Sequence, residues 1–185
     1  MNDWNTETAE WYAANFGDYP TNRLAVDYLD LKDLITIVDV GCGTGSALRH
    51  AAEKVENGNF IGIDPVPRMI EIAREQTENN PSYKPISFKI GLAEDLPIVD
   101  GIADVVFAFD SIDHWKDVNQ GLFEIRRIIK TGGQFVIVKD RSVPNSPESL
   151  ELLKKELISS GFKIETLLEI KEDGVTFFIL TCSIN

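Results

Sequence analysis

Apolar runs rich in β-branched residues alternate with helical patterns along most of the chain, and this alternation restricts the fold more than any other feature. The runs are apolar on both faces, as parallel strands are when helices cover both sides of their sheet. Five runs are predicted as strands, at residues 34–40, 59–64, 86–90, 103–109 and 133–140. The intervals between them leave room for crossover helices. The pattern therefore predicts an α/β fold with a doubly wound, mostly parallel sheet and helices on both faces.

Apolar side chains at helical spacing predict the covering helices. The three stripes are Leu48, Ala51, Ala52 and Val55; Met69, Ile70 and Ala73; and Val118, Leu122, Ile125 and Ile129. Pro67 stands where the second helix opens, and Thr131-Gly132-Gly133 is predicted to end the third. Each stripe is expected to cover one face of the sheet.

The last third of the chain has a different pattern. A helix is predicted from Ser146 to Ser160, and it ends at Gly161. Two further apolar runs flank residues 171–174, whose Asp-Gly step is typical of a β-hairpin turn. We therefore expect one domain over residues 1–185, in which residues 141–185 form a helix plus a hairpin after a core of residues 31–140.

Length, charge and cysteine use narrow the partners. A chain of 185 residues with 43% hydrophobic residues suits a single core. Its net charge of −12 argues against binding to nucleic acid. No run reaches the roughly 18 apolar residues of a membrane span, and the acidic start lacks the features of a signal peptide. Cys42 and Cys182 have no metal-ligand spacing, so we interpret them as thiols of a cytoplasmic protein without a metal site.

The sharpest local motif is Asp39-Val40-Gly41-Cys42-Gly43-Thr44-Gly45, between the first strand and its helix. Glycines at such a turn let a ligand approach the backbone. The residue three after Gly43 is Ser46, so the motif misses the GxGxxG fingerprint of dinucleotide binding, and no P-loop lysine follows. The motif thus indicates a ligand other than a dinucleotide or a nucleoside triphosphate.

Two carboxylates refine the nature of that ligand. Asp64 ends the second strand, where a carboxylate can accept hydrogen bonds from both hydroxyls of a ribose. The loop and Asp64 together predict an adenosine ligand. Asp39 places a negative charge where a diphosphate is disfavoured and an ammonium group is favoured. This argues against the alternative of an NAD-dependent oxidoreductase.

Five ordered motifs resemble those of the class I S-adenosylmethionine-dependent methyltransferases. They are IVDVGCGTGSAL, FIGIDPVPRMIEIARE, GLAEDLP, ADVVFAFDSIDHW and LFEIRRIIKTGGQFVIV, within residues 20–140. The resemblance is closest to the small-molecule group that includes ubiquinone/menaquinone-biosynthesis-like enzymes. It implies a Rossmann-like, seven-stranded sheet with the last strand antiparallel between two others. It also implies S-adenosyl-L-methionine as the cofactor.

The resemblance assigns the cofactor contacts position by position. They are Gly41, Cys42, Gly43 and Gly45 around the methionine and ribose; Asp39 at the amino end; Asp64 at the ribose hydroxyls; Pro65 and Met69 near the adenine face; Ala93 and Glu94 along the adenine edge; and Phe109 at the methionine end. Leu92 departs from the family pattern, which usually has a polar residue there for the adenine amino group. Residues 1–30 correspond to the family's lid, from which Tyr12 is expected to contact the cofactor.

The lid segment is dense in aromatic residues, and the sequence predicts a helix and a loop there. The aromatic residues are Trp4, Trp11, Tyr12, Phe16 and Tyr19. The simplest interpretation is that about half of them pack the helix onto the sheet.

Candidate catalytic residues follow the fourth strand, because α/β enzymes bind substrates outside the carboxyl ends of strands. Methyl transfer from a sulfonium chiefly needs alignment and exclusion of water, and it needs a base only when the nucleophile arrives protonated. Asp110 and His114 are predicted as catalytic residues, with Asp113 between them. Asp140 and Arg141 end the fifth strand on the same side, and we interpret Arg141 as a solvated charge.

The predicted function is methyl transfer from S-adenosylmethionine to an O, N or C atom of a small-molecule acceptor. Two alternatives stay open. One is a methyltransferase-like binding module that keeps the cofactor pocket without turnover. The other is a methyltransferase that acts on a macromolecule.

Overall fold

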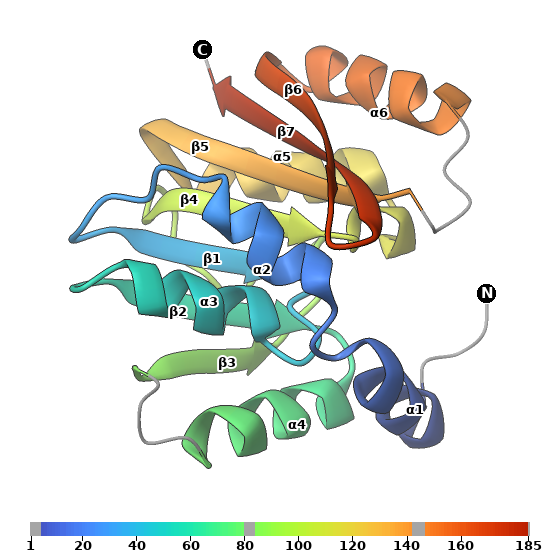
Figure 1. Cartoon of the computed structure of the whole chain (residues 1–185). Helices are drawn as coiled ribbons and strands as arrows, with labels where there is room; N and C mark the ends of the chain where they lie inside the picture. Colours follow the sequence, from blue (N-terminus) through green and yellow to red (C-terminus); the bar gives the residue numbers. More distant parts are fainter. Residues whose placement is uncertain (1–4, 80–83, 142–146, 185) are drawn as a thin grey trace.

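The computed structural model describes residues 5–79, 84–141 and 147–184 (Figure 1). Trp4 and Ser146 of the sequence predictions lie outside these residues. Within them, seven strands form one sheet in the order β3-β2-β1-β4-β5-β7-β6. The strands are β1 (Thr36–Val40), β2 (Asn59–Asp64), β3 (Ile86–Ile90), β4 (Ala103–Phe109), β5 (Ile129–Asp140), β6 (Phe162–Glu172) and β7 (Val175–Ile184).

The strand directions confirm the predicted sheet. The pairings among β1 to β5 are parallel, whereas β7 runs antiparallel between β5 and β6. Asp173 and Gly174 join β6 to β7, both with positive φ, as the two-residue turn of an Asp-Gly hairpin requires. The strand order reverses between β1 and β4, so a crevice is expected outside the carboxyl ends of these two strands.

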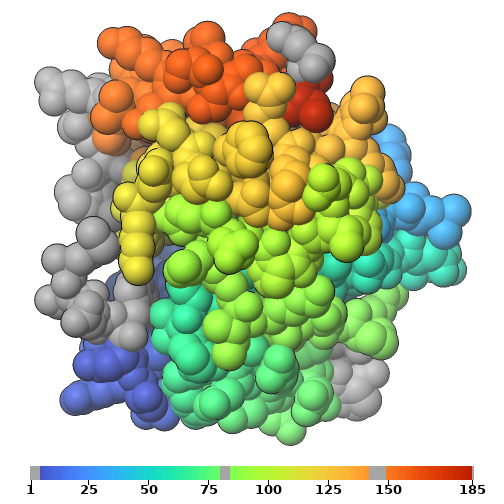
Figure 2. Space-filling model, turned by 180° about the vertical axis from the view of Figure 1, so that it is seen from behind, coloured from blue at the N-terminus to red at the C-terminus, as the bar shows by residue number. Residues whose placement is uncertain are grey.

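Helices cover both faces of the sheet, as predicted. The helices are α1 (Thr6–Phe16), α2 (Pro20–Asp27), α3 (Ser46–Lys54), α4 (Pro67–Glu78), the 3-10 turn η1 (Ile112–His114), α5 (Val118–Ile128) and α6 (Pro147–Ser159). The core cluster on one face joins α2, α3 and α4 to the strands, and the cluster on the other face joins α5 and α6 to them. Seen from behind, α6 and α5 lie over the upper part of this second face, coloured orange and yellow (Figure 2).

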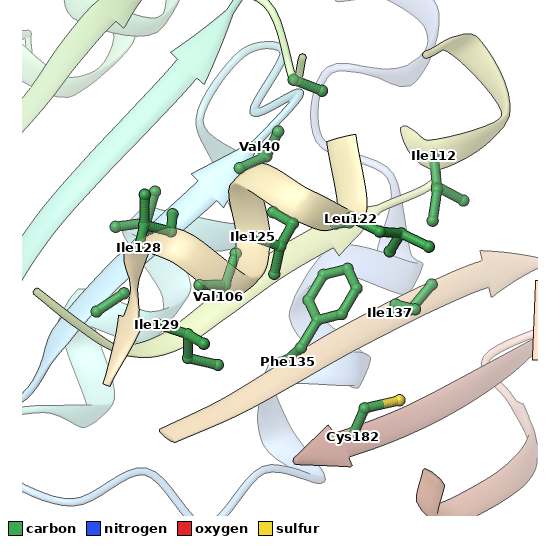
Figure 3. Packing of buried hydrophobic residues seen from close by; sticks show 14 of the residues in the cluster. Val40, Val106, Ile112, Leu122, Ile125, Ile128, Ile129, Phe135, Ile137 and Cys182 are labelled. Carbon is green, nitrogen blue, oxygen red and sulfur yellow. The ribbon is translucent and has the colours of Figure 1, made fainter. Parts of the chain in front are cut away.

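The packing under α5 shows how the apolar stripe closes the second face. Leu122 and Ile125 of α5 point at Phe135 of β5 and Val106 of β4, and all four side chains are fully buried (Figure 3). Burial of each such side chain stabilises the fold by roughly 1.5–3 kcal/mol. This packing fixes β4 and β5 side by side, and both strands end at the candidate site.

Two boundaries differ from the sequence predictions. The prediction that Thr131-Gly132-Gly133 ends a helix was wrong, because α5 ends at Ile128 and the three residues lie inside β5. The pairing of β4 with β5 shifts register between Ala103 and Val105, so the early part of β5 forms a bulged strand. The first strand begins at Thr36 rather than Leu34, which is 83% exposed and has positive φ.

Helix α2 replaces the loop predicted after α1. Pro20 opens it, as proline does at a first helical position, and Leu24, Ala25 and Val26 are buried. Eight residues are too few for a clear apolar period, which explains why the sequence pattern missed it. None of the described helices combines the length and apolar character needed to cross a bilayer.

Candidate functional site

A cavity of about 550 Å³ lies where β1, β4 and β5 end, and the first two helices close it. Eight predicted site residues line it: Tyr12, Asp39, Gly41, Cys42, Gly43, Phe109, Asp110 and His114. The arrowheads of β1, β4 and β5 point to this edge of the sheet (Figure 1). The cavity is thus the crevice expected at the reversal of strand order.

The glycines of the loop have different local surroundings. A Cβ on Gly41 would collide with Ser111, and one on Gly45 would lie 2.8 Å from the Phe88 ring, so both positions are closed by packing. Gly43 has a φ of +50° and nothing within 4 Å of the place where its Cβ would be. Because Gly43 also lines the cavity, its missing side chain leaves space for a ligand against the backbone.

Asp39 is a buried carboxylate at the edge of this space. Its side chain lines the cavity, it is only 1% exposed, and its Oδ1 has no hydrogen-bond partner in the part of the chain that the structure describes. Burial, together with the charge of Asp64, raises the pKa of Asp39 to about 8. A buried, ionised carboxylate is costly, so the fold favours the protonated form of Asp39, and a cationic ligand group beside it would favour the ionised form instead.

Asp64 shapes the loop from the end of β2. Its Oδ2 accepts the N–H of Gly43 at 3.0 Å, and its Oδ1 accepts the N–H of Val66 at 2.9 Å. Burial raises the pKa of Asp64, although these two bonds and nearby His114 act in the opposite direction. Each carboxylate oxygen keeps a second lone pair, so the predicted bonds from ribose hydroxyls are compatible with these contacts.

Asp110 lies directly after β4 in a left-handed conformation, with a φ of +49°. Its Oδ1 accepts the N–H of Asp140 at 2.6 Å, which fixes the carboxylate between the ends of β4 and β5. Burial raises the pKa of Asp110 to about 7. A proton acceptor in this range suits general-base work near neutral pH.

Asp113 does not line the cavity, although the predicted catalytic residues Asp110 and His114 on either side of it in the sequence do. Asp113 accepts a bond from Lys139 Nζ at 2.7 Å, and this lysine is only 2% exposed. Asp113 is not among the residues that line the cavity, whereas His114, the next residue in η1, is. The ion pair therefore holds the turn that carries His114.

Three aromatic residues of α1, together with Tyr19 before α2, form an aromatic wall of the cavity. Phe16 contacts Trp11, Tyr12 and Tyr19, with ring centroids 5.5–5.8 Å apart, and all four rings line the cavity. Burial and the charges of Asp110 and Asp64 raise the pKa of Tyr12 to about 12. Tyr12 therefore lies within electrostatic reach of both predicted carboxylates.

Hydrogen bonds and one ion pair hold this helix over the loop. Thr44 Oγ1 donates to the Gly17 carbonyl at 2.5 Å, and Ser46 Oγ donates to Asp18 at 2.9 Å. Arg68 of α4 pairs with Glu10 of α1 at 3.1 Å. In Figure 1, α1 lies beside α4 at the edge of the molecule where the strands end.

Six predicted cofactor residues lie outside the cavity lining: Gly45, Asp64, Pro65, Met69, Ala93 and Glu94. Met69 packs against Ala9 and Val66, and Glu94 accepts the N–H groups of Lys116 and Asp117 at 2.5 and 2.9 Å. Ala93 is buried in the core, whereas Pro65 and Leu92 are exposed. The adenine contacts of these residues remain predictions.

Several lining residues were absent from the predicted site, namely Thr8, Trp11, Phe16, Gly17, Tyr19, Asn22, Thr44, Ala47 and Asp140. The sequence placed Asp140 at the end of the strand next to β4, on the same side as Asp110, but did not assign it to the site. It is buried and accepts a bond from Thr21 Oγ1 at 2.7 Å. Arg141 instead pairs with Glu169 at 2.9 Å, away from the cavity lining.

Among the described residues, no group of three or more His, Cys, Asp or Glu side chains could hold a metal ion.

Residues 38–137, more than half of the chain, match the family model described as a methyltransferase domain. A ubiquinone/menaquinone biosynthesis C-methyltransferase from Geobacter sp. (strain M21) is 32% identical over 68% of this chain and 53% of its own length. An O-methyltransferase from Penicillium expansum is 29% identical over 74% of this chain and 55% of its own length. The chain thus spans about half the length of these two relatives.

Solved structures agree with this match at the level of fold. The crystal structure of an S-adenosylmethionine-dependent methyltransferase from Aquifex aeolicus superposes with a TM-score of 0.81 at 19% identity. The superposition covers 98% of this chain and all of that one. The chain therefore belongs to the methyltransferase domain family and has the fold of the class I S-adenosylmethionine-dependent methyltransferases.

Proposed function

We propose that this chain is an S-adenosylmethionine-dependent methyltransferase that acts on an O, N or C atom of a small-molecule acceptor by in-line displacement. One observation carries the proposal. The buried carboxyl group of Asp39, whose Oδ1 has no hydrogen-bond partner among the described residues, and the open backbone at Gly43 line the same cavity at the switch point of the sheet. A ligand with an ammonium group and a slender chain fits that combination.

The residues that line the cavity suit the amino-acid end of S-adenosylmethionine, and neighbouring residues are assigned to its ribose and adenine. Asp39 would hold the amino group, and the backbone at Gly41, Cys42 and Gly43 would lie along the methionine and ribose. Asp64 would accept the ribose hydroxyls beside the Gly43 N–H that it already binds. For the adenine, Pro65 and Leu92 offer exposed apolar surface at the ends of β2 and β3.

When bound, S-adenosylmethionine supplies an electrophilic methyl group on a positively charged sulfur, which is an excellent leaving group. The protein therefore has to orient an acceptor, exclude water and, for a protonated nucleophile, take up a proton. The aromatic residues that line the cavity would limit the access of water to a bound acceptor. Asp110 and His114 are the lining groups that can accept a proton at a carboxylate oxygen or an imidazole nitrogen.

Further features support the finer parts of the proposal. The net charge of −12 disfavours a nucleic-acid substrate, and the two named relatives are a C-methyltransferase of quinone biosynthesis and an O-methyltransferase. The thiols of Cys42 and Cys182 are free and buried, which supports a cytoplasmic location. We include in the proposal a single domain made of lid, core and hairpin over residues 1–185.

The test is turnover with a panel of small acceptors that carry hydroxyl, amine or activated carbon nucleophiles. The expected result is acceptor-dependent formation of S-adenosylhomocysteine. Asp110→Asn should lower the rate about 10²-fold or more if the acceptor arrives protonated. Tight cofactor binding without product from any acceptor would favour the alternative of a binding module. Failure of the cofactor to bind at all would overturn the proposal.

A further inference from the structure

Four aromatic residues form a wall of the cavity. Trp11, Tyr12, Phe16 and Tyr19 line it, with neighbouring ring centroids 5.5–5.8 Å apart. Trp11 remains 59% exposed although it belongs to this wall. Large aromatic surface left exposed beside a cavity is a mark of ligand binding. The wall comes from a different part of the chain than the glycine loop. The cavity therefore has an aromatic surface in addition to the surface formed by the predicted cofactor residues.

Facing this wall, the ionisable groups are mostly acidic. Asp39, Asp110 and Asp140 line the cavity, whereas no Lys or Arg occurs among the seventeen described residues that line it. His114 is the lining residue that can carry a positive charge. Burial raises the pKa of Tyr12 in the wall, and the charges of Asp110 and Asp64 add to this effect when they are ionised.

Basic side chains close to the lining residues in sequence form ion pairs elsewhere. Arg23, one residue after Asn22, pairs with Asp27 and Asp173, and Arg141, next to Asp140, pairs with Glu169. Lys139 is buried and pairs with Asp113 at 2.7 Å. The charge of Lys139 also acts on Asp110, where it opposes the burial that raises the pKa of that carboxyl. An anionic acceptor would nevertheless meet no Lys or Arg among the described residues that line the cavity.

We propose that the half of the cavity between the aromatic wall and Asp110 binds a small organic ammonium, so that the acceptor class is an amine. This inference rests on the proposed function, in which Asp39 is assigned to the amino group of the cofactor. A cation over aromatic faces is stabilised by the ring quadrupole. A carboxylate in the same cavity would supply the counter-charge, and Asp110 lines that cavity.

The same geometry provides for the proton that an ammonium must lose. Asp110 Oδ1 accepts the Asp140 N–H, which holds the carboxylate in place, and the proton passes to a free lone pair of this carboxylate. The N–H bond breaks, an O–H bond forms, and the electron pair stays on nitrogen as its lone pair. Burial, which raises the pKa of Asp110 to about 7, brings the carboxyl closer to the pKa of an amine.

Calorimetry with three matched probes tests this inference on the full chain saturated with S-adenosylhomocysteine. The probes are 3-phenylpropylamine, 3-phenylpropanol and 3-phenylpropionate, which share a ring and chain length but differ in charge. The amine should bind at least about tenfold more tightly than the alcohol, and the carboxylate should bind most weakly. Equal binding of all three probes, tighter binding of the alcohol or carboxylate, or no binding of the amine would overturn the inference.

Two variants, each with a matched control, test whether Asp110 causes the preference for the amine and whether Trp11 contributes to the binding of the probes. Asp110→Asn keeps the shape, and Asn tolerates the left-handed backbone of this position. It should reduce the preference for the amine over the alcohol to within about threefold, whereas Asp95→Asn, an exposed acid outside the cavity lining, should keep it. Trp11→Ala should weaken all three probes several-fold, and Phe123→Ala, which removes a ring of similar exposure on α5, should not. Retention of the full preference in Asp110→Asn would also contradict the inference.

The outcomes separate this inference from the function on which it rests. Absence of S-adenosylhomocysteine binding is a failure of the proposed function. Normal S-adenosylhomocysteine binding without a preference for the amine leaves the methyltransferase proposal in place and rejects the amine as acceptor class. The comparison of probes on the unmodified chain decides the point even if a variant does not fold.

Discussion

The carboxylate of Asp39 is buried, lacks a partner on Oδ1 and has a pKa raised to about 8 from an ordinary 3.8. Between these two pKa values the folded state holds a proton that the unfolded state has lost. Stability due to this group is therefore present below pH 4 and is lost as the pH rises through 8. We compare the free energy of unfolding of Asp39→Asn with that of the wild type, both without ligand. The variant should gain about 1–3 kcal/mol more over the wild type at pH 9 than at pH 4.

Urea denaturation of both proteins at pH 4 and pH 9 measures this difference. Asp110 also has a raised pKa, but it is common to both proteins and cancels in the comparison. Asp30→Asn removes an exposed ion pair with Lys32 and serves as the control, which should change the free energy of unfolding by less than about 1 kcal/mol at either pH. Parallel stability curves for the wild type and Asp39→Asn would mean that Asp39 is not held protonated by the fold.

Gly43 and Gly132 form a matched pair for testing the open backbone at the loop. Both have positive φ, and neither has an atom within 4 Å of the place where a Cβ would lie. Alanine at either position should cost roughly 1–2 kcal/mol of stability because of the left-handed backbone. Only Gly43→Ala places a methyl group in the cavity, so only this variant should lose affinity for S-adenosylhomocysteine, by about tenfold or more.

Thermal unfolding and calorimetry on the two glycine variants separate strain from steric exclusion. If both variants lose the same affinity for S-adenosylhomocysteine, the loss is caused by backbone strain and not by the methyl group in the cavity. Unchanged affinity in Gly43→Ala would place the ligand elsewhere.

At the level of single residues, the sequence predicted those whose chemistry is local. Asp39, Gly43 and Asp110 stand at the ends of readable strands, and such ends meet at one edge of a parallel sheet. The roles of Asp140 and Tyr19 depend on contacts between distant segments. The bond from Thr21 to Asp140 spans 119 positions, and no local pattern encodes it.

Among the elements, the turn η1 depends on a buried ion pair with β5. Lys139 is 2% exposed and its partner Asp113 is about half exposed. Asp113→Asn leaves the buried ammonium with a neutral partner, and it should cost roughly 1–3 kcal/mol of stability. Chemical denaturation of the wild type and the variant measures this cost.

Asp100→Asn is the control for this substitution. Asp100 pairs with Arg127 at 2.7 Å, but it is 79% exposed and Arg127 keeps Glu124 as a second partner. Loss of such a surface pair should cost less than about 1 kcal/mol. If both variants lose the same free energy of unfolding, the burial of Lys139 does not strengthen its ion pair with Asp113.

Element boundaries were predictable where apolar runs end at polar residues. The bounds of β2, β3 and β4 match the prediction, because Asp64 and Asp110 stop two of the runs and Gly91 the third. The start of β5 was not predictable. Its residues Thr131-Gly132-Gly133 have the composition of a helix end, and their place in the sheet comes from pairing with β4.

For the whole molecule, two packed faces leave one crevice at the reversal of strand order, and the first helices close it. The fold class followed from the alternation of strands and helices, since few topologies bury runs that are apolar on both faces. The position of α1 and α2 over the cavity did not follow from it. That position depends on the bonds from Thr44 to Gly17 and from Ser46 to Asp18, which join segments 27 and 28 residues apart.

Isothermal titration with S-adenosylhomocysteine tests the central claim that this crevice is a cofactor site. The wild-type chain should bind one molecule with a Kd below about 100 μM. Asp64→Ala should bind at least about tenfold more weakly, because it loses both the predicted ribose contact and the bond that shapes the loop at Gly43. No binding by the wild type, with Asp64→Ala equally inert, would contradict the account.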